Sequence, residues 1–171
     1  MTAGKVRVIG ASNYTAPRLR EALDVSERLG LPRYESLQPH YNLVHRDAYE
    51  EALEPLVSET GLGVIPYYAL ASGFLTGKYR SQADLAGRAR AKGAGAYLDG
   101  KGSAVLAALD AVAMRTGANV TQVALAWLIA RPSITAPIVS ASHVDQVGDL
   151  IKATALRLSA ADIVFLDEAS A

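Results

Sequence analysis

The chain has 171 residues, half of them apolar and a fifth charged, which suits one globular domain spanning 1–171. With 17 basic and 17 acidic side chains the net charge is zero, so the composition gives no reason to expect binding to nucleic acid or to an anionic membrane. There is no cysteine for disulfide or thiolate chemistry, no apolar run near the roughly 20 residues of a membrane span, and no signal-peptide core near the N-terminus, so we expect a cytoplasmic protein.

Short apolar runs alternate with longer amphipathic segments, which is the pattern of parallel strands joined by helices. The first run predicts a strand over 6–10. A helix follows, with Thr15 as its N-cap, Pro17 in its first turn and Gly30 at its end. This is the first strand–helix unit.

The second unit is expected to have its strand over 34–38, where Pro39 stops it, and its helix over 47–60. Pro55 conflicts with a continuous helix because proline lacks an N–H group and crowds the preceding turn. The sequence therefore predicts a kink near Pro55.

The third strand is expected over 63–67, and a long loop follows over about 68–102. This segment is rich in Gly, Ala and Arg and has no clear period beyond Arg80. Loops of such length inside a compact domain are usually functional or disordered.

The last part of the chain is mainly helical. Helices are expected over 103–115 and 120–130, and Asn119 with Gln122 predicts a capping box at the start of the second. A fourth strand is expected over 135–139. Two further helices are expected, one over 144–153 and one from Ser159 onward.

These elements indicate an α/β fold with four parallel βα units and extra C-terminal helices. Such units occur in small doubly wound sheets and in (β/α)8 TIM barrels. A whole barrel needs ~250 residues, so this chain has the length for half of one. A half-barrel would leave sheet edges and an apolar inner face without partners, which predicts self-association.

Polar and aromatic residues recur at the predicted carboxyl ends of the strands, which is the ligand face of parallel α/β folds. They are Ser12, Asn13, Gln38, Tyr67, Ser140 and Ser142. The amides of Asn13 and Gln38 both donate and accept hydrogen bonds, which suits a carboxamide, and Tyr67 offers a flat face for stacking. The alternative for each residue alone is a turn or an internally satisfied polar group.

Several segments resemble, in chain order, the second half of the aldo-keto reductase family, which comprises strands five to eight of its barrel. They are Gly4–Asn13, Leu37–Asn42, Gly63–Tyr67, Gly73–Tyr79, Gln122–Leu128, Pro137–Ile138 and Gln146. The resemblance covers nearly the whole chain and implies NADP(H)-dependent reduction of small carbonyl compounds by hydride transfer.

The resemblance also implies roles for single residues. In the family, the equivalents of Ser12, Asn13 and Gln38 hold the nicotinamide carboxamide, and the equivalent of Tyr67 stacks on the ring. For the pyrophosphate, the resemblance implies contacts from Tyr68, Ala69, Leu70, Ser72, Gly73 and Leu75. For the adenosine phosphate, it implies contacts from Ser140, Ser142 and Gln146.

Two departures from the family pattern lie at the phosphate end. Tyr68–Ala69 stands where Ser-Pro is common, and Ser142–His143 stands where an Arg or Lys often meets the 2′-phosphate. The resemblance implies NADP(H), and the missing Arg or Lys leaves NAD(H) as the alternative.

The family's catalytic Asp, Tyr, Lys and His come from its first four strands, and this sequence has no segment resembling them. We therefore expect no catalytic residue, no metal site and no turnover by the chain alone, and a carbonyl substrate only where a first half completes the barrel. The alternative is a non-catalytic module that binds nicotinamide or associates with itself. A complete small doubly wound domain of another family is a third possibility.

Overall fold

The sheet has three parallel strands in the computed structural model, which describes residues 1, 3–87, 91–98 and 100–171. They are β1 (Ile9–Ser12), β2 (Tyr34–Gln38) and β3 (Gly63–Val64), in the order β1-β2-β3. Ala11 lies opposite Leu37, and Leu37 lies opposite Val64. All three side chains are buried, so one face of the sheet belongs to the core.

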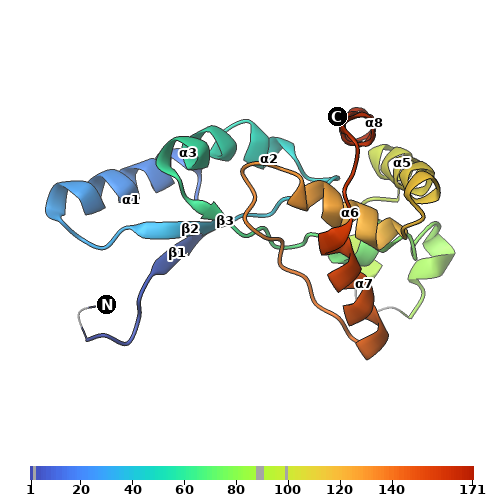
Figure 1. The fold of residues 1–171 in the computed structure, drawn as a ribbon, viewed down its shortest axis with the longest axis horizontal. Coiled ribbons are helices and arrows are strands. Elements are labelled where there is room, and N and C mark those ends of the chain that lie inside the picture. Colours follow the sequence, from blue (N-terminus) through green and yellow to red (C-terminus); the bar gives the residue numbers. More distant parts are fainter. Residues whose placement is uncertain (2, 88–90, 99) are drawn as a thin grey trace.

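Two helices cover this face: α1 (Ala16–Leu29) and α3 (Leu53–Thr60), which Figure 1 shows on the same side of the sheet. Each contributes buried leucines to the core. Gly30 ends α1 in the left-handed conformation, as the sequence predicts. Thr15 is at the predicted N-cap position, but its side chain makes no capping hydrogen bond.

The helix expected over 47–60 is divided into α2 (Asp47–Glu50) and α3. Pro55 is the third residue of α3, where a missing N–H costs nothing because first-turn N–H groups have no helical partner. One long helix would place the proline ring against the carbonyl of Glu51. The chain turns at 51–52 instead, so the predicted kink is a complete break.

The first and third strands differ in extent from the prediction. β1 starts at Ile9, and Val6 and Val8 are exposed. β3 ends at Val64, although the Ile65 and Tyr67 N–H groups still donate to carbonyl oxygens of Leu37 and Pro39. Pairing with the β2 segment therefore continues irregularly as far as Tyr67.

The fourth strand predicted over 135–139 is not formed in the described part of the chain, so four strands are corrected to three. The segment is extended beside β3, and the N–H groups of Thr135 and Ile138 donate to the Val64 and Pro66 carbonyls. The Val64 N–H bonds to the Thr135 hydroxyl rather than to a backbone carbonyl, and Pro137 has no N–H to donate. A regular ladder is thereby prevented.

The segment over 68–102 is not the structureless loop that the sequence predicts. It contains two 3-10 helices, η1 (Ala71–Thr76) and η2 (Gln82–Leu85), and the short helix α4 (Ala91–Gly95). Phe74 is buried and anchors η1 in the core. Residues 88–90 and 99 of the expected loop lie outside the described residues.

The rest of the chain forms α5 (Lys101–Thr116), α6 (Val120–Ile129), α7 (Val144–Ala155) and α8 (Ala160–Ala169). Figure 1 shows an elongated molecule with the sheet, α1 and α3 at one end and α5–α8 at the other. The predicted Asn119–Gln122 capping box is present at the start of α6. None of the described helices is long and apolar enough to cross a membrane.

Candidate functional site

The face of β1 and β2 that points away from the helices is small and polar. Because Ala11 and Leu37 face the helices, alternation places Gly10, Ser12 and Gln38 on the opposite face, together with Ser36. We call this the open face. It corrects the apolar inner face expected from the sequence, at least over these two strands.

Gly10 keeps the open face flat. A Cβ atom at this position would lie 2.4 Å from Ser36 Oγ and 3.2 Å from the Ser36 carbonyl oxygen. A larger residue would force the Ser36 side chain to move and would crowd the Ser36 backbone. The absence of a side chain here leaves room for a ligand to approach the sheet.

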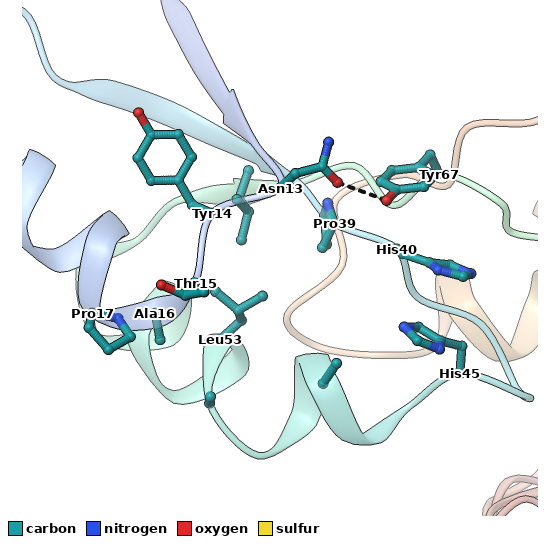
Figure 2. A pocket seen from close by; sticks show the side chains of 13 residues that line it. Asn13, Tyr14, Thr15, Ala16, Pro17, Pro39, His40, His45, Leu53 and Tyr67 are labelled. Atoms are coloured by element: carbon teal, nitrogen blue, oxygen red, sulfur yellow. Dashed lines mark hydrogen bonds between the residues drawn. The ribbon is translucent and has the colours of Figure 1, made fainter.

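Two pairs of side chains lie at the carboxyl end of the sheet. Ser12 is opposite Gln38 in the strand register, and its hydroxyl donates to the backbone carbonyl oxygen of Gln38 over 2.9 Å. The Tyr67 hydroxyl donates to Asn13 Oδ1 over 2.8 Å, as Figure 2 shows. The structure therefore brings together the four residues predicted for the nicotinamide end.

Asn13 is held by the turn from β1 into α1. Its φ of 59° is in the left-handed region, which asparagine tolerates better than most residues. This turn directs the side-chain oxygen of Asn13 toward Tyr67 (Figure 2).

Tyr67 belongs to a group of stacked aromatic rings. Its ring centroid is 5.4 Å from that of His40, and the His40 ring lies nearly parallel to that of His45 at 3.8 Å. Burial, and secondarily the neighbouring His45, lowers the pKa of His40 to about 4. His40 is therefore uncharged at neutral pH.

Asn42 supports the loop that follows Tyr67. It is fully buried, its Nδ2 donates to the Tyr68 carbonyl over 2.9 Å, and its Oδ1 accepts from the Val44 N–H. Sequence reasoning did not single out Asn42. The signal available was a polar residue inside the apolar run Tyr41–Val44.

The residues predicted for the pyrophosphate are divided between surface and core. Tyr68 is exposed, and Leu70 and Ser72 are half-buried. Ala69, Gly73 and Leu75 are buried, so only their backbone groups are candidates for contact with a ligand. Tyr68, Ala71 and Ser72 all have positive φ, and such strained backbone is common at functional sites.

The residues predicted for the adenosine phosphate lie before and at the start of α7. The Ser142 N–H and hydroxyl both donate to Gln146 Oε1, at 2.9 and 3.3 Å, whereas Ser140 is exposed in the preceding segment. His143 is the N-cap residue of α7 and makes no side-chain capping bond. The free N–H groups of a helix N-terminus suit an anion.

In the described residues, no group of three or more His, Asp or Glu side chains lies together in a way that could hold a metal ion.

Comparison with known proteins gives one consistent result. The profile of the Aldo/keto reductase family matches residues 1–171. The uncharacterized oxidoreductase YrpG of Bacillus subtilis is 35% identical over 91% of this chain and 46% of its own, and the aldo-keto reductase AMT2 of Alternaria alternata is 32% identical over 91% and 41%. Protein tas of Escherichia coli is 31% identical over 92% and 46%.

The fold is similar to that of a solved structure, a thermostable aldo-keto reductase in complex with the inhibitor epalrestat. The TM-score is 0.74 at 24% identity, over 98% of this chain and 50% of the other. The chain spans about half the length of the curated relatives it matches.

Proposed function

The chain belongs to the aldo/keto reductase family, and we propose that it is the cofactor-binding half of a nicotinamide-dependent carbonyl reductase. The observation that carries this proposal is the convergence of Ser12, Asn13, Gln38 and Tyr67 at the carboxyl end of the sheet. These four residues favour an assignment of the chain to the second half of the barrel, strands five to eight.

The side chains present fit a nicotinamide. Within the described chain, the Gln38 carboxamide and Asn13 Nδ2 have no hydrogen-bond partner, so both are available to a ligand amide. The Tyr67 ring packs against His40 and, edge-on at 5.1 Å, against Tyr68, and it would supply a stacking surface for a flat ring. When bound, the cofactor would supply hydride to the carbonyl carbon of a substrate.

At the phosphate end, we propose that Ser140, Ser142 and Gln146 approach the adenosine phosphate at the start of α7, and that residues 68–75 approach the pyrophosphate. Hydroxyl groups and a helix N-terminus bind phosphate without a basic side chain. NADP(H) is the proposed cofactor because the family resemblance implies it, and NAD(H) is the alternative because no Arg or Lys stands beside Ser142.

Titration of NADPH fluorescence tests the site. The chain should bind NADPH, and Gln38→Ala should weaken binding about 5- to 10-fold because one hydrogen bond contributes about 1 kcal/mol. Gln82→Ala, in the exposed helix η2, is the matched control and should leave the affinity unchanged. Equal affinities for Gln38→Ala and the unmodified chain would contradict the proposed site, and parallel titration with NADH decides the cofactor preference.

The proposal includes inactivity of the chain alone, since no residue here is assigned to proton donation. Pure protein mixed with NADPH and a reactive aldehyde should therefore give no aldehyde-dependent loss of NADPH absorbance. Turnover above that of the buffer would overturn this part of the proposal while leaving the cofactor site intact.

A second candidate function, a non-catalytic half-barrel that associates with itself, is favoured by the edge of the sheet. β1 has no strand partner on its outer side among the described residues, and Val6, Val8 and Ile9 are exposed by 46%, 62% and 37%. An exposed apolar edge strand is a template for pairing with a second chain.

Sedimentation velocity tests this candidate. The chain should sediment as a dimer or larger species, and Val8→Lys, directly before β1, should shift it toward monomer because a charge beside an edge strand opposes pairing. Met114→Lys, at an 86% exposed position on α5, should leave the distribution unchanged. A monomer at all concentrations would exclude self-association.

A further inference from the structure

The helix α7 packs on α6 through one side. Ala153 is buried on this side, and Asp149 accepts a hydrogen bond from the Gln122 side chain of α6 over 3.0 Å. The opposite side of α7 is also apolar, although Val144 and Ile151 are exposed by 86% and 64% and a helix normally presents polar residues to water. We call this side the outer face. It consists of Val144, Gly148, Ile151 and Ala155, which are all exposed.

Large and small residues alternate along the outer face. Val144 and Ile151 are seven residues apart, as are Gly148 and Ala155, and a repeat of seven is typical of helices that pair as a coiled coil. In an antiparallel pair of two α7 helices the order is reversed, so Gly148 lies opposite Ile151 of the second copy, and Val144 lies opposite Ala155. Each layer then combines a large residue with a small one, which allows close packing. A parallel pair would instead place large against large and small against small.

Two opposite charges flank the outer face on the same side. Asp145 directly follows Val144, Lys152 directly follows Ile151, and both charged side chains are exposed and form no ion pair within the described part of the chain. A two-fold axis perpendicular to the helices reverses their direction but keeps this side, so Asp145 of each copy lies beside Lys152 of the other. Charged residues beside a coiled-coil seam set the choice of partner and its orientation. Charge and size therefore both favour a second copy in the antiparallel orientation.

We propose that the outer face of α7 is a dimerisation surface, on which α7 of a second copy of this chain packs in the antiparallel direction. The surface shares no residue with the proposed cofactor site. It is also separate from the β1 edge, which lies in the other part of the molecule (Figure 1). A two-fold contact closes on itself, so association through α7 stops at the dimer. One pair of three-turn helices is small beside the ~1,600 Å² of a standard interface, and the dimer is accordingly weak and dependent on concentration.

Sedimentation velocity over a concentration series measures the dimer, in chains that all carry Val8→Lys to remove pairing through the β1 edge. Gly148→Leu adds apolar area to the outer face, and a Cβ atom at this position has no heavy atom within 4 Å in the monomer. The substitution should nevertheless weaken dimerisation about 10-fold, because the leucine side chain collides with Ile151 of the second copy. Ala161→Leu, at an exposed alanine of α8, is the control and should change nothing. Unchanged or tighter association in Gly148→Leu would overturn the proposal.

Charge reversal tests the orientation. Asp145→Lys and Lys152→Asp each replace two attractive contacts of the dimer by two repulsive ones, so each should weaken dimerisation about 5-fold at low salt. The double variant should restore it. Within one chain the two side chains are about 10 Å apart along the helix, so rescue has to come from contacts between copies. If the double variant were no better than the single ones, the antiparallel pairing would be excluded, and unchanged association in all three would mean that the outer face is not covered by a second copy. Either result would overturn the proposal.

Discussion

Replacing Asp167 with alanine should lower the free energy of unfolding by about 3 kcal/mol, a large effect for one side chain at a helix end. Asp167 lies in α8, and its Oδ1 accepts from the indole N–H of Trp127 over 2.8 Å. It also forms an ion pair with Arg131, whose guanidinium stacks 4.2 Å from the centroid of the Trp127 ring. One carboxylate thus accepts from the buried indole and from one end of the half-buried Arg131 guanidinium, whose buried Nε has no partner among the described residues.

Arg46 joins the same group from the start of α2. Its guanidinium is 5.6 Å from the Trp127 ring centroid and donates to the Asp167 carbonyl oxygen and to the Ser170 hydroxyl, each over 2.8 Å. The Glu50 carboxylate binds the other edge of this guanidinium. The cluster therefore joins α2, α6 and α8, which are far apart in sequence, and its loss should release the C-terminal helix.

Urea unfolding followed by circular dichroism measures the effect. Asp24→Ala, at an exposed carboxylate of α1, is the control and should change stability by less than about 0.5 kcal/mol. Asp167→Asn retains an acceptor for the indole but loses the ion pair, so its loss of stability should be smaller than that of Asp167→Ala and larger than that of Asp24→Ala. A loss below about 1 kcal/mol in Asp167→Ala would show that the cluster does not stabilise the fold.

Features set by local chemistry could be predicted from the sequence. Gly30 ends α1, Asn119 and Gln122 form the capping box of α6, and the Ser159 hydroxyl accepts from the Asp162 N–H at the start of α8. Each of these depends on residues within one helical turn. The positions of the nicotinamide candidates also follow locally, because a residue after a parallel strand lies at the same edge as its counterparts.

Features set by contacts between distant segments could not be predicted. Whether 135–139 forms a strand depends on the Thr135 hydroxyl occupying the Val64 N–H. The stacking of His40 on His45 depends on a tight turn in which the Asn42 and His45 backbones bond to each other. No period or motif in the sequence indicates that turn, so the ring stack was not expected.

Protonation of His40 should lower the free energy of unfolding by about 3 kcal/mol as the pH falls from about 7 to about 4. In the folded chain the pKa of His40 is lowered to about 4, chiefly by burial, whereas an unfolded histidine titrates near 6.5. The unfolded state therefore binds a proton first. The stabilisation is complete above pH 6.5 and is lost progressively as the pH falls toward 4.

Carboxylates also titrate toward the lower end of this range, so the difference between variants isolates the histidine. His40→Gln keeps a polar side chain beside His45, Asn42, Tyr67 and Tyr68 but removes the titrating group, and its stability should depend less on pH between 6.5 and 4. His143→Gln, at the exposed N-cap of α7, should follow the unmodified profile. If the stability of His40→Gln and of His143→Gln depended on pH in the same way, His40 would make no contribution to the pH dependence of folding. His40 would then protonate without loss of its stacked arrangement with His45.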